Sequence, residues 1–380
     1  MNKRIYLDNA STTPLHEEVK NTMKNVMENE FGNSSSIHFH GRRARTIVEQ
    51  SRKTIAKLLN ASVGEIFFTS SATEANNMVL KSLVSESGIK RIISSPTEHH
   101  CVLHSLDWIS QMNMAEVVYL PVNNLGQPDL SELERLLKEH PTPTLVSLMY
   151  GNNEIGTLLD IENTIRICKL YQALFHCDAV QAIGKVPLDL QKINIDYLSA
   201  SAHKFHGPKG SGFVYIRQEN MINPFIHGGA QERNMRAGTE NTYGIAGMAK
   251  ALEIAIQNMD NHKSHLISLR SAFKYKLMQV IPDVQFNGDQ GDNSLPHILS
   301  VSFPPHQKGD LLIMNLDIAG ISASSGSACA SGVESDSHVL QAIGHDSRRK
   351  TIRFSFSVYN TLEELHEVAE KLAMLTQEST

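Results

Sequence analysis

Residues 144–178 read TLVSLMYGNNEIGTLLDIENTIRICKLYQALFHCD, and this stretch sets the expected fold class. It begins with an apolar, β-branched run at Thr144–Met149, passes through a helical pattern at 161–172 and ends in a second apolar run at Leu174–Asp178. A helix of that length between two short apolar runs is typical of two parallel strands joined by a crossover helix. The stretch therefore predicts one unit of a parallel α/β sheet.

Strand and helix patterns alternate in the same way from about residue 44 to residue 260. The further strands are predicted at Ile66–Thr69, Arg91–Ser94, Val117–Leu120, Ile195–Ala200 and Phe213–Ile216, and the further helices at 44–59, 73–86, 101–112 and 130–139. We therefore expect an α/β fold whose large domain, residues 12–260, has a mostly parallel central sheet flanked by helices.

The order of the patterns changes after about residue 260. Helices are predicted at 264–280, 309–319 and 362–372, and strands at His297–Ser302 and Thr351–Ser357. We expect these elements to form a smaller α+β domain of residues 261–380, together with residues 1–11.

The composition directs the functional interpretation towards small-molecule chemistry. Of the 380 residues, 41% are hydrophobic and 20% are charged, which is typical of a globular protein. The formal net charge of −5 predicts no basic surface for nucleic acid or for an anionic membrane. No apolar run approaches the roughly 18 residues of a membrane span, and the polar start MNKRIYLDNASTTP does not resemble a signal peptide. We expect a cytoplasmic protein with neither a nucleic-acid partner nor a membrane partner.

Lys204 lies in the loop SAHKFHGPKG, residues 201–210, which follows the predicted strand Ile195–Ala200 directly. A lysine among small residues at the end of a strand is removed from solvent, which lowers the pKa of its amine and suits it to a Schiff base. A solvated loop lysine is the alternative, so this hypothesis needs further support.

Asp178 ends the strand Leu174–Asp178, and Gln181 follows three positions later. A carboxylate at this position can keep a pyridinium nitrogen protonated, as a pyridoxal phosphate ring requires. The alternative is an aspartate that caps a following helix.

The segment TSSATEANN, residues 69–77, places small hydroxyl residues between a predicted strand and a predicted helix. Free amides and hydroxyls at a helix N-terminus bind phosphate. The same segment allows a capping box between Ser71 and Glu74. The two interpretations are compatible, because a cap position is also where a phosphate docks.

Cys329 lies in SSGSACASG, residues 324–332, where small neighbours give a thiol reach and exposure. We therefore expect a nucleophilic cysteine at this position. Cys101, Cys168 and Cys177 stand in apolar contexts and are expected in the core. The spacing of the four cysteines predicts neither a disulfide framework nor a zinc ribbon.

His99 follows the strand Arg91–Ser94, where its ring would stack on a planar cofactor or transfer protons, unless it is an ordinary surface histidine. His100 and His104 have the i, i+4 spacing of metal-binding helices. With no third ligand evident in the sequence and no HExxH motif, we expect no metal site.

Together these motifs resemble the cysteine desulfurases of the NifS/IscS kind, a branch of the fold-type I enzymes that use pyridoxal phosphate. The resemblance runs through YLDNASTTP (6–14), FGNSSS (31–36), TSSATEANN (69–77), TEH (97–99), NNEIGT (152–157), DAVQ (178–181), SAHKFHGPKG (201–210), HGG (227–229), RAGTEN (236–241) and SSGSAC (324–329). A single match would be weak, whereas so many in consistent order are specific.

The resemblance implies a role in cofactor binding for several matching residues. Lys204 carries pyridoxal phosphate as a Schiff base, Asp178 pairs with the ring nitrogen, His99 stacks on the ring and Gln181 bonds the phenolic oxygen. The phosphate is held by Ala72, Thr73, Ser201 and His203. Thr239 corresponds to a phosphate contact from the neighbouring subunit, which implies a homodimer.

The resemblance also implies a substrate site and a reaction, the conversion of L-cysteine to L-alanine. Asn153 lies close to cofactor and substrate, Arg353 binds the substrate carboxylate through its planar guanidinium, and Asn33 is assigned to the substrate. Lys204, once released from the cofactor, removes the Cα proton, and the thiolate of Cys329 attacks the sulfur of the substrate.

The enzyme is left with a persulfide, which passes to an acceptor protein or a small thiol for iron–sulfur cluster assembly or other sulfur biosynthesis. The sequence stops at Thr380, without the tail by which iron–sulfur members bind a scaffold protein, so the acceptor stays open. A selenocysteine lyase or an aminotransferase of the same fold is an alternative, and an aminotransferase would not need Cys329. The other alternative is a non-catalytic sulfur-transfer partner.

Overall fold

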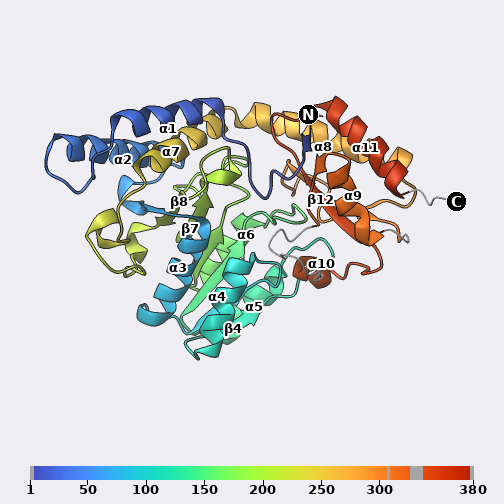
Figure 1. Cartoon of the computed structure of the whole chain (residues 1–380). Helices are drawn as coiled ribbons and strands as arrows, with labels where there is room; N and C mark the ends of the chain where they lie inside the picture. Colours follow the sequence, from blue (N-terminus) through green and yellow to red (C-terminus); the bar gives the residue numbers. More distant parts are fainter. Residues whose placement is uncertain (1–3, 306–308, 326–336, 377–380) are drawn as a thin grey trace.

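A seven-stranded sheet forms the centre of the larger body of the molecule (Figure 1). The structure, a computed structural model, describes residues 4–305, 309–325 and 337–376. The strand order is β2-β8-β7-β6-β5-β3-β4, and every pair is parallel except the two pairs that involve β8. The strands are β2 (Ile66–Thr69), β3 (Arg91–Ser94), β4 (Glu116–Tyr119), β5 (Thr144–Met149), β6 (Leu174–Asp178), β7 (Tyr197–Ser201) and β8 (Gly212–Ile216). The expected α/β fold with a mostly parallel sheet is confirmed.

Four crossover helices cover this sheet, and each begins at a side-chain cap. They are α3 (Ala72–Glu86), α4 (His100–Gln111), α5 (Leu130–Glu139) and α6 (Ile161–Leu170), capped by Ser71, His99, Asp129 and Asp160. The strands between them are apolar because helices bury both faces of the sheet. The loops that follow β3, β5, β6 and β7 therefore gather at one edge of the sheet, and these loops carry most of the polar motifs.

Three further helices, α1 (Glu17–Asn29), α2 (Phe39–Leu58) and α7 (Thr242–Gln257), lie together along the upper left of Figure 1. Neither α1 nor α7 was predicted from the sequence. Ten of the sixteen residues of α7 are buried, so the helix lacks the one-sided apolar stripe from which a surface helix is predicted. Gly247 lies so close to Met23 of α1 that a Cβ atom would come within 2.7 Å of its side chain.

The smaller body contains an antiparallel sheet in the order β12-β10-β9, covered by three helices. Its strands are β9 (Gln285–Asn287), β10 (Ile298–Phe303) and β12 (Lys350–Ser355), and its helices are α8 (Met259–Val280), α9 (Leu312–Ile318) and α11 (Leu362–Thr376). Phe273 of α8 packs edge-on against Phe354 of β12, with ring centroids 5.1 Å apart. The helix predicted at 309–319 begins as a 3-10 turn, Gly309–Leu311, before α9.

The N-terminal segment joins this smaller body, because β1 (Ile5–Tyr6) pairs in parallel with β11 (Ile321–Ser322). The short helix α10 (His338–Ala342) completes the described elements. The domain boundary predicted between residues 260 and 261 falls within the first turn of α8 and stays a prediction. None of the helices in the described ranges is long and apolar enough to cross a membrane.

Candidate active site

A cavity of about 310 Å³ lies between the two bodies, beside the ends of β5, β6 and β7. Ten residues to which the resemblance assigned a role line it, namely Ala72, Thr73, His99, Asn153, Asp178, Gln181, Ser201, His203, Lys204 and Arg353. These residues span more than two thirds of the chain, and the fold alone brings them together. Cys329 lies outside the described residues.

Lys204 ends the turn Ala202–Lys204 that follows β7, and its amine is held at the cavity. Its Nζ donates hydrogen bonds to the carbonyl oxygens of Ala10, at 2.6 Å, and Ser11, at 2.8 Å. The side chain is half-buried, so the alternative of a freely solvated loop lysine does not describe it.

A second lysine supports the same turn. The Nζ of Lys185 donates to the carbonyl oxygen of Lys204 at 2.9 Å. Burial, and then the charge of Lys204, lower the pKa of Lys185 to about 7. The amine of Lys185 therefore loses its proton more readily than an ordinary lysine does, and its hydrogen bond holds the backbone of the turn that carries Lys204.

The buried carboxylate of Asp178 is held by two donors. Its Oδ1 accepts the backbone N–H of Val180 at 3.0 Å, and its Oδ2 accepts Nδ2 of Asn76 at 2.7 Å. The residues after Asp178 form turns and no helix, so the predicted alternative of a helix cap is wrong. The hydrogen bond from the N–H of Val180 to Oδ1 of Asp178 is nevertheless of the kind that a capping residue accepts.

Asn76 belongs to a buried chain of hydrogen bonds that orients Asp178. Because Asn76 Nδ2 donates to the carboxylate, its Oδ1 must accept, and the partner is Nε2 of His176 at 3.1 Å. Burial lowers the pKa of His176 to about 3, so the ring is neutral and carries its proton on Nε2. Its Nδ1 then accepts from Oγ of Ser147 at 2.8 Å. This chain of hydrogen bonds was not predicted from the sequence, although a histidine inside the apolar strand LFHCD was an available signal.

Hydroxyl groups surround the N-terminus of α3 at one end of the cavity. Oγ of Ser201 accepts the backbone N–H of Ala72 at 3.2 Å. Thr73 and His203 also line the cavity. Ser71 accepts the N–H of Glu74 at 3.4 Å. The Glu74 carboxylate, however, accepts the backbone N–H of Ser70 rather than that of Ser71, so only half of the expected capping box forms. The helix N-terminus and these hydroxyls make a site for an anion.

His99 is half-buried at the cavity and caps α4. Its Nδ1 accepts the backbone N–H of Cys101 at 3.1 Å, so the neutral ring carries its proton on Nε2. Burial lowers the pKa of His99, which keeps the ring neutral. This tautomer suits a ring that stacks or donates a hydrogen bond, and it makes His99 a poor acceptor for a proton.

Cys101 is partly buried, since it packs against the hydrophobic core and also lines the cavity, whereas Cys168 and Cys177 are buried as expected. Cys101 is the second residue of α4, two positions after His99, and its Sγ lies 3.0 Å from the histidine Nδ1. Burial, followed by the charge of Asp178, raises the pKa of Cys101 to about 12. Its thiol therefore stays protonated at neutral pH.

Arg353 brings a guanidinium from β12 of the smaller body to the cavity. Its Nη1 donates to the carbonyl oxygen of Asn153 at 2.8 Å, and its Nη2 donates to Oδ1 of Asp8 at 2.9 Å and to Oγ of Ser11 at 2.7 Å. A planar guanidinium held in this way is suited to a carboxylate.

Asn33 and Thr239 do not line the cavity and are exposed. Their two loops are joined by a hydrogen bond of 2.6 Å from Oγ of Ser34 to Oε2 of Glu240. The two residues therefore share one outer surface, and within this chain neither has the contact that the resemblance assigned to it.

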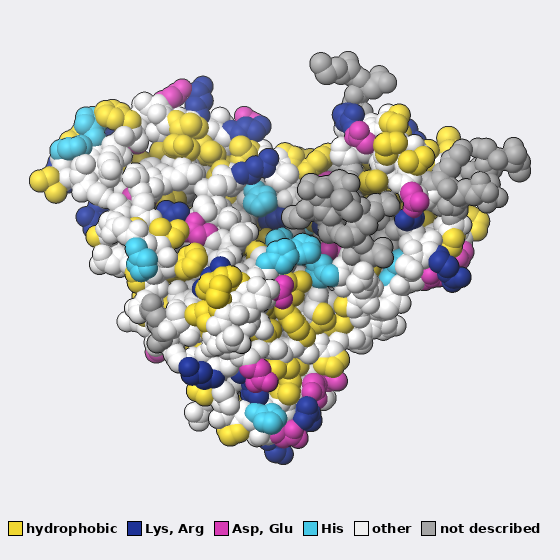
Figure 2. Space-filling view, turned by 60° about the horizontal axis from the view of Figure 1, so that its bottom comes forward, with side chains coloured by type: hydrophobic (Ala, Val, Ile, Leu, Met, Phe, Trp, Pro, Cys, Tyr) yellow, Lys and Arg dark blue, Asp and Glu magenta, His cyan; other side chains and the backbone are white. Residues whose placement is uncertain are grey.

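Histidine side chains gather near the middle of the face seen in Figure 2. The ring of His100 lies 5.2 Å from that of His104 and 4.6 Å from that of His338, between centroids. Within the described ranges, no group of three or more His, Cys, Asp or Glu residues is arranged to hold a metal ion.

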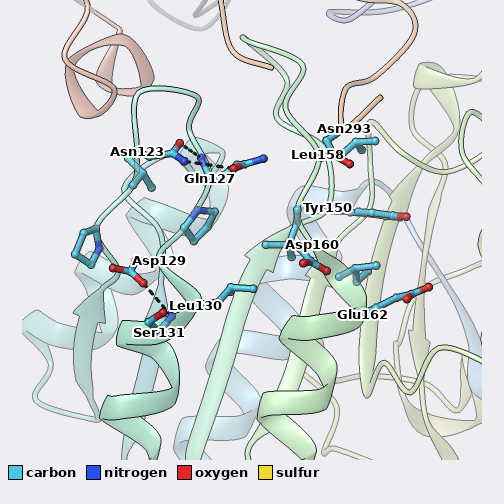
Figure 3. A pocket seen from close by; sticks show the side chains of 15 residues that line it. Asn123, Gln127, Asp129, Leu130, Ser131, Tyr150, Leu158, Asp160, Glu162 and Asn293 are labelled. Carbon is cyan, nitrogen blue, oxygen red and sulfur yellow. Dashed lines mark hydrogen bonds between the residues drawn. The ribbon is translucent and has the colours of Figure 1, made fainter. Parts of the chain in front are cut away.

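A larger cavity, of about 910 Å³, lies beside the N-termini of α5 and α6 (Figure 3). Asp129 and Asp160 already cap these helices, and Oδ1 of Asn123 accepts N–H groups of its own turn. The helix N-termini are therefore already occupied by carboxylates. None of the residues predicted to carry chemistry lines this cavity, so the smaller cavity is the candidate site.

Comparison with known proteins places the whole chain in one family. The model of the family "Aminotransferase class-V" matches residues 5–368. The chain is 42% identical to "Cysteine desulfurase IscS" of Dictyoglomus turgidum, over 99% of this chain and 95% of that one. It is 39% identical to "Putative cysteine desulfurase IscS 1" of Bacillus subtilis, over 100% of both chains.

Solved structures give the same result. A "NIFS-LIKE PROTEIN" superposes with a TM-score of 0.91 at 40% identity, covering 98% of this chain and 99% of that one. "SspA in complex with cysteine" superposes with a TM-score of 0.80 at 31% identity, covering 94% and 100%. These matches show that the chain belongs to the aminotransferase class-V family, in the branch of the cysteine desulfurases.

Proposed function

We propose that the protein converts L-cysteine to L-alanine with pyridoxal 5'-phosphate bound in the 310 Å³ cavity, and that Cys329 receives the sulfur as a persulfide. The observation that carries this proposal is the convergence of four groups on one cavity. These are the amine of Lys204, the carboxylate of Asp178, the N-terminus of α3 and the guanidinium of Arg353.

The residues present fit this cofactor. The N-terminus of α3, with Ser201, Thr73 and His203, offers donors for a phosphate, and Asp178 offers a buried carboxylate for a ring nitrogen. When bound, pyridoxal phosphate supplies an aldehyde that condenses with the amino group of the substrate and a ring that accepts an electron pair from Cα.

The chain's own groups divide the remaining tasks. The amine of Lys204 accepts the Cα proton, and Lys185 holds the turn behind it through a hydrogen bond to the carbonyl oxygen of Lys204. Asn76 keeps the charge of Asp178 in place through its 2.7 Å hydrogen bond. Arg353 binds the carboxylate of the substrate and so fixes the direction in which its side chain lies.

Cys329 completes the reaction as a thiolate that attacks the sulfur of the substrate. The Cβ–S bond of the substrate breaks and an S–S bond forms, so the sulfur leaves with Cys329 and the carbon skeleton takes up a proton to become alanine. The persulfide then passes to an acceptor protein or a small thiol. The relative solved as "SspA in complex with cysteine" supports L-cysteine as the substrate.

The active form in this proposal is a homodimer. The surface that carries Asn33 and Thr239 also exposes large apolar side chains, with Phe31 79%, Ile37 92% and Phe39 56% exposed. An apolar group of this kind on a folded protein is typical of a protein interface. A second copy docked there would cover it and give Thr239 a neighbouring cavity to contact. The expected cytoplasmic location stays a prediction.

The test is the yield of alanine and sulfide from L-cysteine, with pyridoxal phosphate added and with a small thiol as the reductant that releases the persulfide sulfur as sulfide, for the unchanged protein and for Cys329→Ala. We expect equal amounts of both products from the unchanged protein, and neither from the variant although it keeps the cofactor. Cys101→Ser is the matched control, because Cys101 is the described cysteine at the cavity, and we expect it to keep desulfuration. Turnover that is independent of Cys329 would instead support an aminotransferase.

A further inference from the structure

A buried histidine lies behind the cavity wall and contacts Gln181. His297 directly precedes β10 in the smaller body and is buried. Its Nε2 lies 3.1 Å from Oε1 of Gln181, a residue that lines the cavity, whereas His297 itself does not line it. The contact therefore joins the smaller body to the wall of the site in the larger body.

The partners of Gln181 fix which way round its amide lies. Nε2 of Gln181 donates to the carbonyl oxygen of Ala10 at 2.8 Å, and a carbonyl oxygen can only accept. Oε1 of Gln181 can likewise only accept, so the proton in its contact with His297 comes from the histidine Nε2. The carbonyl oxygen of Ala10 also accepts from Nζ of Lys204, so this amide and the amine of the site share one acceptor.

The protonation of His297 agrees with this assignment. Burial, followed by the charges of Lys185 and Arg353, lowers the pKa of His297 well below its usual range, so the ring is neutral and has one N–H. In the described part of the chain, Nδ1 of His297 has no hydrogen-bond partner. The single proton is therefore used at Nε2, on Gln181.

We propose that His297 is a positioning residue, which holds the amide of Gln181 so that its second N–H is the group that Gln181 presents to the cofactor. This inference rests on the proposed function, because it assigns a task to an amide that faces bound pyridoxal phosphate. With its Oε1 engaged by His297, Gln181 acts as a donor to the phenolic oxygen. Without His297 the orientation of the amide is held only by the hydrogen bond from its Nε2 to the carbonyl oxygen of Ala10, so its second N–H is directed less firmly at the phenolic oxygen.

The expected consequence is spectroscopic. A hydrogen bond donated to the phenolic oxygen stabilises negative charge there, and with it the form of the bound cofactor that prevails at higher pH. Loss of the donor should raise the midpoint of the pH titration of the visible absorption band by about 0.5 to 1 pH unit. A residue that merely fills space would not move this midpoint.

The test compares His297→Gln with His297→Met. The two side chains have similar length and volume, but only glutamine has an N–H near the position of the histidine Nε2. We expect the methionine variant to show the raised midpoint and the glutamine variant to restore it. In a Gln181→Met background, His297→Met should cause no further shift of the midpoint, because the amide through which His297 acts is absent.

A second readout needs no cofactor. In the cofactor-free protein, ¹⁵N NMR of the histidine rings should show His297 neutral with its proton on Nε2 between pH 5 and about 8. A proton on Nδ1, equal shifts in the two His297 variants, or a full shift in the Gln181→Met background would overturn the proposal. Protein that never binds pyridoxal phosphate would contradict the proposed function, and the NMR result would still decide the state of His297.

Discussion

The cavity wall and the outer surface around Asn33 and Thr239 differ in how completely one chain builds them. On the wall, Asp178 is held by Asn76 and Lys204 by two backbone carbonyls, all from the same chain. On the outer surface, Asn33 and Thr239 are exposed beside large apolar side chains. The difference supports the proposal that residues assigned by one resemblance belong to two kinds of site, one whose described residues lie together within a single chain and one that a second copy would complete.

Removal of the amine at the wall should have the largest effect. We expect Lys204→Ala to lower kcat for alanine formation at least about a thousandfold, because Lys204 is the one lysine among the described residues that line the cavity. Lys209→Ala is the matched control, since Lys209 is an exposed lysine in the same loop, and its kcat should stay within about twofold. A comparable loss in both variants would mean that the loop, and not the amine, is responsible.

Removal of the support of Asp178 should have a smaller effect on the same wall. Asn76→Leu deletes the 2.7 Å hydrogen bond to the carboxylate while keeping similar volume, and we expect the affinity for pyridoxal phosphate to fall about 10- to 100-fold. The measurement is a fluorescence titration of the cofactor-free protein. Asn77→Leu on the same helix, whose amide donates only to the carbonyl oxygen of Thr73, should change the affinity much less. An equal loss of affinity in both variants would contradict the role of the hydrogen bond from Asn76 to Asp178.

A change at the outer surface should act through assembly. Ile37→Asp combined with Phe39→Asp places charge on two exposed positions, so the single chain should fold normally while the dimer dissociates. Light scattering should show half the mass, and the activity should fall about tenfold and recover in part at high protein concentration. Ile318→Asp is the control, a 75% exposed residue of α9 on the other side of the molecule (Figure 1). If the double variant kept the molecular mass of the unchanged protein, the outer surface would not be a dimer interface, and the proposed difference between it and the cavity wall would be wrong.

The smallest effect concerns the free energy of unfolding of the protein at acid pH, through two histidines at or behind the cavity wall. Burial lowers the pKa of His176 to about 3 and that of His203 to about 4, so between those values and about 6.5 the unfolded chain binds more protons than the folded one. Stability should therefore fall as pH falls below about 6.5, with His176 contributing about 1.4 kcal/mol per pH unit. Urea unfolding at several pH values measures this, and His176→Asn should give a shallower slope. A stability that rises as pH falls from 6.5 to 4.5 would contradict the assignment of a neutral buried His176.

The sequence predicted the central sheet closely, because its strands are short apolar runs separated by helical patterns. The ranges of β2, β3, β5 and β6 agree with the predicted ones residue for residue. The short strands β1, β9 and β11 were missed, since two or three residues carry no periodicity and their pairing depends on distant segments. The helix α7 was missed because burial on most sides removes the one-sided pattern.

The site shows the same difference between features marked by a local sequence pattern and features that depend on distant contacts. Residues in sequence motifs, such as Lys204 and Asp178, were found because strand-end loops mark them. The roles of Asn76, His176 and His297 were missed, although Asn76 lies in the motif TSSATEANN, since each acts through contacts with residues about 100 positions away in the sequence. The exposed position of Thr239 could be recognised only in the folded chain.

The central claim, that sulfur passes from L-cysteine to Cys329 under the action of the wall residues, is tested most directly by one turnover without reductant. After reaction with one equivalent of L-cysteine, mass spectrometry of the peptide that contains Cys329 should show the addition of one sulfur atom, in amounts equal to the alanine formed. The Lys204→Ala variant should show neither product. Alanine formed without sulfur on that peptide would contradict the account.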